Sequence, residues 1–128
     1  MKDFFHSHTL KTLCIFIAFG FLCGSCKHKT DFNDLKEVSY SKDIAPIINS
    51  NCAYSGCHGD VNYEHFSIVS YDGISNAHIT PGSPEKSKFY QVLKTYGDDI
   101  MPKKPYNELT ESQILLIYVW IGQGAKNN

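Results

Sequence analysis

The stretch Asn51-Cys52-Ala53-Tyr54-Ser55-Gly56-Cys57-His58-Gly59 decides how the rest of this 128-residue chain is interpreted. Two cysteines with a histidine directly after the second form the attachment signature of a c-type haem. The pattern has a chemical reason, because two thiols can add across the two vinyl groups of haem while the adjacent imidazole reaches the iron. We therefore predict that Cys52 and Cys57 form thioethers and that His58 is the proximal iron ligand.

The spacing within this motif is wide, with four residues between the cysteines where two are usual. The intervening loop must bulge outward, and Ser55-Gly56 gives it the freedom to do so. A Cys52–Cys57 disulfide is an alternative in an oxidising compartment. Zinc is disfavoured because Cys57 and His58 are adjacent and cannot easily both bind one ion. Blue copper is disfavoured because its His2Cys set with a weak Met usually lies on a β scaffold.

A methionine later in the chain supplies a candidate sixth ligand. Once Met1 is removed, Met101 is the only methionine, and it follows His58 by 43 residues in a proline-stiffened loop, DDIMPKKP, at 98–105. A core methionine would more often lie on a helical stripe, whereas a thioether in a rigid loop suits an iron ligand. We predict Met101 as the distal ligand, with His65 or His78 as the alternative.

The first 25 residues predict an export signal. The apolar run from Leu13 to Cys23 has 11 residues, too few for a spanning helix and typical of a signal-peptide core. The residues that follow, up to Cys26, resemble a bacterial lipobox. We expect residues 1–25 to be a lipoprotein signal peptide, Cys26 to be lipidated, residues 26–38 to form a polar membrane tether, and residues 39–128 to form the domain. A soluble secreted protein cut nearby, with Cys26 free or paired, is the alternative.

The domain sequence shows helical periodicity in four segments and no clear strand alternation, which predicts an irregular all-α fold. The segment 41–51 places isoleucines on one face, and the segment 66–77 is broken by Tyr71-Asp72-Gly73. A third helix begins with Ser83 as N-cap and Pro84 in its first turn. Its apolar stripe comprises Phe89, Val92, Leu93 and Tyr96.

The fourth helix has the clearest boundaries. Thr110 and Gln113 match a capping box at its start, and Gly122 with Gly124 marks its end. Its predicted apolar stripe comprises Ile114, Leu115, Ile117, Tyr118 and Ile121.

Composition excludes two broad classes. The chain contains no arginine, and without residues 1–25 it has 10 lysines against 12 acidic residues. A nucleic-acid-binding protein normally carries a basic stripe, so we predict no nucleic-acid partner. The apolar fraction of 42% is too high for a disordered chain.

Taken together, these features resemble a class I c-type cytochrome domain, of the small bacterial lipoprotein cytochrome c type. The resemblance rests on the Cys52–His58 motif, on Met101-Pro102, and on a closing helix that ends WIGQGA at 120–125. It covers about residues 40–125. It implies a cytochrome c-like fold of three to four short helices around one covalently attached haem c. Without arginine, the haem propionates must be met by lysine, tyrosine, Trp120 or backbone groups, and Tyr54, Tyr63, Tyr71, Tyr90 and Trp120 are candidates to line the haem.

The resemblance implies an electron carrier rather than an enzyme. With two axial ligands the iron has no vacant site, and methionine–histidine ligation raises its reduction potential. We expect a monohaem cytochrome, lipid-anchored in the cell envelope and facing the periplasm or cell exterior, that docks briefly on redox proteins. One alternative is a haem domain with a displaceable sixth ligand that binds peroxide or a gas. Another is a disulfide-stapled binding lipoprotein without a cofactor.

Overall fold

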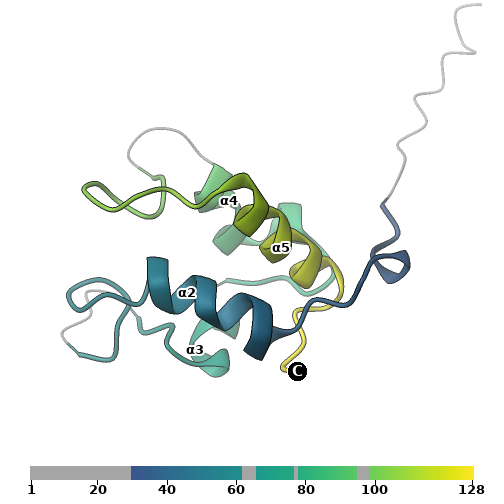
Figure 1. The fold of residues 1–128 in the computed structure, drawn as a ribbon, viewed down its shortest axis with the longest axis horizontal. Coiled ribbons are helices and arrows are strands. Elements are labelled where there is room, and N and C mark those ends of the chain that lie inside the picture. Colours follow the sequence, from purple (N-terminus) through teal and green to yellow (C-terminus); the bar gives the residue numbers. More distant parts are fainter. Residues whose placement is uncertain (1–29, 62–65, 77, 95–98) are drawn as a thin grey trace, which may run out of the picture. The chain divides into compact units, whose positions relative to one another are not determined.

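The computed structural model describes residues 30–61, 66–76, 78–94 and 99–128. They belong, apart from Thr30, to one compact unit, Asp31–Asn128. The described residues form helices and loops without a strand, so the predicted all-α class is confirmed (Figure 1). None of the helices described is long and apolar enough to cross a membrane. The predicted signal peptide and Cys26 lie outside the described residues.

The first predicted helix is confirmed and leads directly to the cysteine motif. A π-helical turn, η2, covers Tyr40–Ile44 and continues into α2, Ala45–Asn51. Pro46, which has no amide proton, lies in the first turn of α2, directly after the π-helical turn. Cys52 is the C-cap residue of α2, so the end of this helix places the first cysteine.

The segment Tyr71-Asp72-Gly73 begins a helix instead of breaking one, and this prediction was wrong. The short helix α3 covers Tyr71–Ser75, and the Ser70 hydroxyl caps it by accepting from the Gly73 amide at 3.2 Å. A Cβ at Gly73 would collide with the Ser67 carbonyl oxygen. The glycine is therefore explained by the close approach of the preceding chain.

The third predicted helix is divided by a buried serine. A 3-10 turn, η3, covers Pro84–Lys86, and α4 covers Lys88–Lys94. Between them Ser87 is fully buried; its hydroxyl accepts from the Thr80 amide at 2.9 Å and donates to the Ser83 carbonyl at 3.0 Å. Such local bonds between a side chain and the backbone compete with helix formation. Ser83 is the N-cap residue of η3 and Pro84 its first residue, as predicted, although the Ser83 side chain makes no capping hydrogen bond.

The fourth predicted helix is confirmed as α5, Glu111–Gly122, with both bonds of the Thr110–Gln113 capping box. The chain then turns at Gly124, whose φ of +103° favours glycine. The predicted stripe needs one correction, because Leu115 is 60% exposed whereas Trp120 is fully buried. Tyr96 of the third helix lies outside the described residues.

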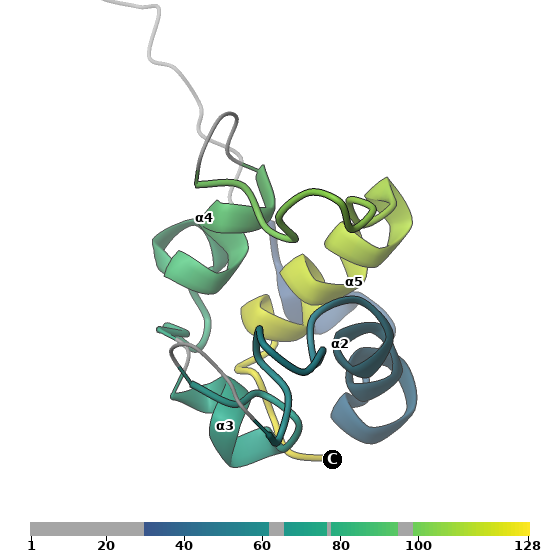
Figure 2. The same ribbon diagram turned by 90° about the vertical axis from the view of Figure 1, so that its left-hand side faces the viewer.

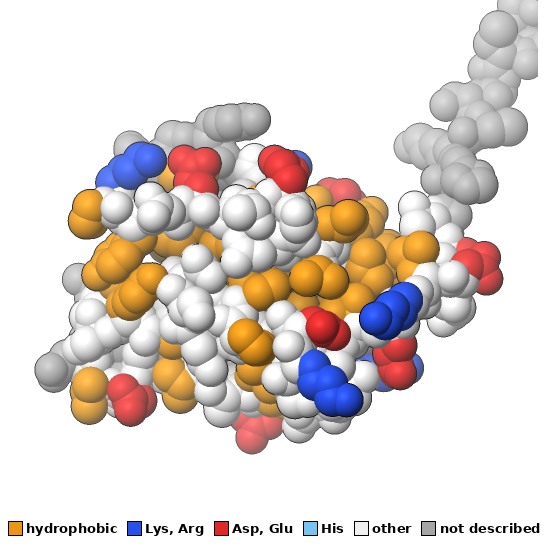
Figure 3. Space-filling view, viewed as in Figure 1, with side chains coloured by type: hydrophobic (Ala, Val, Ile, Leu, Met, Phe, Trp, Pro, Cys, Tyr) orange, Lys and Arg blue, Asp and Glu red, His pale blue; other side chains and the backbone are white. Residues whose placement is uncertain are grey.

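The hydrophobic core joins α5 to the other helices. Figure 2 shows α2, α3, α4 and α5 arranged around a common centre, and on the face in Figure 3 hydrophobic side chains form a band between α2 and α5. The buried residues of the hydrophobic core are Val38, Tyr40, Ile44, Ile47, Ile48, Ile68, Ile74, Phe89, Leu93, Leu109, Ile114, Ile117, Trp120, Ile121 and Ala125.

Residues 31–38, the second part of the predicted tether, are attached to the end of α5. The Gln123 side chain accepts from the Val38 amide at 2.9 Å and donates to the Phe32 carbonyl at 3.2 Å. The Phe32 ring packs on Tyr118, with 5.4 Å between ring centroids. A Cβ at Gly122 would collide with the Phe32 ring. The folded unit therefore includes this segment.

We predict that Gly122→Ala destabilises the protein by about 1–3 kcal/mol, the usual cost of overpacking, because the new methyl group displaces Phe32. Urea denaturation measures the change. In a Phe32→Ala background the same substitution should be neutral or stabilising, since alanine is favoured over glycine by up to about 1 kcal/mol within a helix. An equal loss of stability in both backgrounds would contradict this packing.

Candidate haem-binding site

A single cavity of about 410 Å³ brings the predicted site residues together. Cys52, Cys57, His58 and Met101 all line it, although the first and last are far apart in the sequence. Its volume lies within the range of about 300–1,000 Å³ that is usual for small-molecule and cofactor sites. The C-terminal end of α2 and the loop before α5 therefore meet at this cavity.

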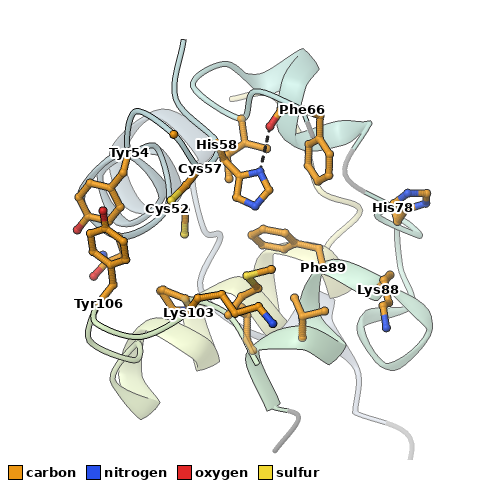
Figure 4. A pocket seen from close by; sticks show the side chains of 17 residues that line it. Cys52, Tyr54, Cys57, His58, Phe66, His78, Lys88, Phe89, Lys103 and Tyr106 are labelled. Carbon is orange, nitrogen blue, oxygen red and sulfur yellow. Dashed lines mark hydrogen bonds between the residues drawn. The ribbon is translucent and has the colours of Figure 1, made fainter. Parts of the chain in front are cut away.

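The walls of the cavity are mainly apolar. Ile68, from the segment before α3, lies on one side, while α4 contributes Phe89, Val92 and Leu93. Figure 4 shows the Phe89 ring directed toward the centre, facing His58. A flat apolar group with polar edges would match this lining better than a charged substrate, because buried charges need partners.

The four-residue insert between the cysteines folds around one carbonyl group. The carbonyl oxygen of Tyr54 accepts from the Cys57 amide at 3.0 Å and from the Gly59 amide at 2.9 Å. Gly56 has a φ of +81° and is exposed, as the predicted outward bulge requires. A Cβ at Gly59 would lie 2.9 Å from the Tyr54 oxygen, so only glycine allows the turn to close this tightly.

One ring nitrogen of His58 is engaged in a hydrogen bond to the backbone. Its Nδ1 lies 3.0 Å from the Phe66 carbonyl oxygen. A carbonyl can only accept, so Nδ1 carries the proton and donates, and Nε2 of the neutral ring keeps a free lone pair. In Figure 4 the ring projects from the attachment loop into the cavity, with this bond on its far side. Metal-ligating histidines are commonly oriented in this way through their second nitrogen.

The two cysteines are free thiols in the structure and do not form the disulfide considered as an alternative. Burial raises the pKa of the Cys52 thiol from 9.0 to about 12, because desolvation disfavours the thiolate. At neutral pH Cys52 is therefore a protonated, unreactive thiol on the cavity wall. Such a group can be a covalent attachment point, but it is a poor nucleophile on its own.

Met101 reaches the cavity through a loop that is tied to α4. Its amide donates to the Val92 carbonyl at 2.9 Å, and the following Pro102 is buried. The loop continues to Tyr106, whose amide donates to the Lys103 carbonyl at 3.0 Å. Met101 is therefore placed by backbone contacts rather than by a helical stripe.

The rim of the cavity is polar. Lys88 and Lys103 line it, as does His78, whose φ is 59°. Figure 4 shows the His78 ring at the side of the cavity away from Cys52. His65, the other predicted alternative to Met101 as the distal ligand, lies outside the described residues.

Several aromatic residues predicted near a haem lie elsewhere. Trp120 is fully buried and its Nε1 donates to the Lys126 carbonyl at 3.0 Å, so it is not available to a propionate. Tyr71 donates to the Ala125 carbonyl at 2.8 Å, and Tyr90 packs on Tyr118. None of Trp120, Tyr71 and Tyr90 lines the cavity, whereas Tyr54 does; Tyr63 lies outside the described residues.

Three aromatic residues that were not predicted do line the cavity: Phe66, Phe89 and Tyr106. Phe89 carried a signal, because it belongs to the apolar stripe of the third predicted helix. Phe66 contacts His58 through its carbonyl group, which any residue could supply, and through its ring, whose centroid lies 4.8 Å from that of the imidazole. Tyr106 follows the methionine loop without a motif.

The donor set fits a haem better than a bare metal ion. Within the described ranges, no three His, Cys, Asp or Glu side chains gather as a metal site. A haem iron needs only two axial ligands from the protein, and here an imidazole, a thioether and two thiols line one apolar cavity. No family model, curated protein or solved structure matches this chain.

The raised pKa of Cys52 predicts a slow reaction with alkylating reagents. We use a haem-free chain of residues 27–128 with Cys57→Ser, in which Cys52 is the only thiol. At pH 8 a thiol with a pKa of about 12 is ionised in only about one molecule in ten thousand. Alkylation, followed by mass spectrometry, should be at least about tenfold slower than in urea, and should accelerate as the pH rises toward 12. Equal rates with and without urea would mean that the haem-free chain does not bury Cys52.

Proposed function

We propose that this protein is a membrane-tethered, monohaem c-type cytochrome that carries single electrons between redox partners outside the cytoplasm. The observation that supports this most strongly is the convergence of Cys52, Cys57, His58 and Met101 on one apolar cavity. Met101 follows His58 by 43 residues, so local sequence proximity does not explain the convergence. On this proposal the all-α domain has a cytochrome c-like fold.

Each residue has a separate task in this proposal. Cys52 and Cys57 provide two sulfur atoms for thioether bonds, one at the end of α2 and one on the turn around Tyr54. His58 presents the Nε2 lone pair, because its Nδ1 proton is engaged by the Phe66 carbonyl. Met101 supplies a thioether sulfur from the loop tied to α4.

This ligand arrangement favours electron transfer over catalysis. Bound haem supplies a one-electron iron couple, and methionine–histidine ligation raises its potential. If His58 and Met101 both held the iron, no position would be left for a substrate. The apolar residues that line the cavity would limit the access of water, which would also raise the potential by disfavouring the more highly charged oxidised state.

The propionate groups would be met by Lys88 and Lys103, which line the cavity. Trp120, an earlier candidate, is already bonded within the core. Lipidation at Cys26 would hold the domain at the membrane, where transient docking on redox proteins requires only short movements. Several acyl chains would make this attachment stable, whereas one would not.

Haem staining after denaturing electrophoresis tests the proposal directly. The protein is produced in a bacterial host with intact cytochrome c maturation machinery. We expect a stained band, because thioether-linked haem survives denaturation, and a mass increased by one haem. An unstained band whose mass equals polypeptide plus lipid would reject the proposal.

Replacement of the distal ligand should change the potential and not the attachment. We predict that Met101→Ala retains covalent haem and lowers the reduction potential by more than about 59 mV, a tenfold loss of preference for the reduced state. The weak near-infrared band of the ferric iron–sulfur bond should also disappear. His78→Ala is the matched control, since His78 lines the same cavity and should leave both properties unchanged. An unchanged potential in Met101→Ala would exclude this residue as ligand, and a change only in His78→Ala would identify the alternative.

Removal of one attachment thiol should reduce maturation. We predict that Cys57→Ser lowers the yield of haem-stained protein to a small fraction, because only one thioether can form. Ser55→Ala is the control within the same loop, since Ser55 lies between the two cysteines, is exposed and carries no thiol. A normal yield from Cys57→Ser would count against attachment at this position.

A further inference from the structure

Two tyrosine rings connect the attachment loop to the methionine loop at the rim of the cavity. Tyr54 and Tyr106 stack nearly parallel, with 4.3 Å between ring centroids and 13° between ring planes. Both residues line the cavity. Figure 4 shows the two rings face to face at one edge of the cavity, beside Cys52 and Cys57. This contact joins the loop after α2 to the loop before α5.

Tyr54 is fixed on both its backbone and its side chain. Its carbonyl accepts from the amides of Cys57 and Gly59, and its hydroxyl donates to the Ser50 carbonyl at 2.5 Å. The ring is therefore held against the last turn of α2. It presents a rigid face to whatever packs on it.

Tyr106 closes the far end of the methionine loop. The start of this loop is tied to α4 by the bond from the Met101 amide to the Val92 carbonyl. The Tyr106 amide donates a hydrogen bond to the Lys103 carbonyl, which anchors Tyr106 to the loop itself. The stack on Tyr54 therefore gives the loop a second restraint, five residues after the restraint at the Met101 amide.

We propose that Tyr54 and Tyr106 are positioning residues that hold Met101 against the cavity, and that the wide cysteine spacing exists in part to supply Tyr54. The four residues Ala53-Tyr54-Ser55-Gly56 between the cysteines are two more than the usual motif has, and among them Tyr54 stacks on Tyr106. This inference rests on the proposed haem function and adds the element that keeps the sixth ligand in place.

The proposal predicts competition between Met101 and an added ligand. Imidazole binds a ferric haem only while the methionine is displaced from the iron. The apparent dissociation constant for imidazole therefore scales inversely with the fraction of molecules in which Met101 is displaced. An aromatic pair contributes an energy that corresponds to roughly a two- to tenfold change in such an equilibrium. Tyr54→Ala and Tyr106→Ala should therefore each lower the apparent dissociation constant for imidazole roughly two- to tenfold in the full-length haem protein.

Matched variants separate the ring contact from other effects. Tyr106→Phe keeps both rings and the bond from Tyr54 to Ser50, and should bind imidazole as the unmodified protein does. Tyr54→Phe keeps both rings but removes that bond, and should have a smaller effect than Tyr54→Ala. The double variant Tyr54→Ala/Tyr106→Ala should be no more open than either single variant, because each already removes the whole contact. If an alanine variant matures poorly, Tyr106→Leu retains apolar bulk without an aromatic face and should show the same tightening of imidazole binding.

A second readout does not depend on any added ligand. Amide hydrogen exchange of the haem-loaded protein should accelerate at Met101 and Tyr106 in Tyr54→Ala, and remain unchanged in Tyr106→Phe. Unchanged imidazole affinity and exchange in both alanine variants would overturn the proposal. Phenylalanine variants with effects as large as those of the alanine variants would also overturn it, because the role would then belong to the hydroxyl groups. So would a double variant whose effect is the product of the two single effects.

These outcomes are distinct from failure of the proposed function itself. A haem-stained unmodified protein whose imidazole affinity ignores Tyr54 and Tyr106 leaves the cytochrome assignment standing and removes only the positioning role. An unstained unmodified protein removes the cytochrome assignment and the positioning role together.

Discussion

The carbonyl oxygen of Tyr54 accepts two amide hydrogen bonds, from Cys57 and from Gly59, and the candidate site depends on the turn that these bonds close. Without the turn, four residues of free chain would separate Cys57 and His58 from the end of α2. The turn requires glycine at two positions for different reasons: Gly56 for its positive φ, and Gly59 for the close approach to the carbonyl. One acceptor atom thus fixes the backbone on both sides of His58 relative to Cys52, while the Phe66 carbonyl orients the imidazole ring.

The fold was most predictable where a signal was both local and repeated. The capping box and the long apolar period of α5 specify the same helix, and the structure agrees. The division of the third helix depends on Ser87, whose hydroxyl bonds to the backbone of Thr80 and Ser83. A serine between two lysines gives no sign of being buried, because this bonding requires that the chain has already folded back. Local propensity cannot contain such information.

The same distinction applies to the site. The thiols, imidazole and thioether were predictable because their side chains carry the chemistry, and the structure places all four on one cavity. The partners that orient them were not, because the carbonyl groups of Phe66 and Val92 are common to every residue. Trp120 shows the reverse error. Its indole appeared suited to a polar partner near the haem, but it found one in the Lys126 carbonyl within the core.

The cavity also bears on how so small a domain can be stable. Apolar walls that enclose space lose the dispersion contacts that a packed core provides. For a buried cavity the loss grows by about 24 cal/mol per Å³, so if one tenth of these 410 Å³ were left dry, the cost would be about 1 kcal/mol. Folded domains have only about 5–15 kcal/mol in total. A rigid apolar group held by two covalent bonds would replace those contacts and could not be lost by dissociation. On the proposed function, attachment at Cys52 and Cys57 would serve the folding of the chain as well as its chemistry, because filling the cavity stabilises only the folded state.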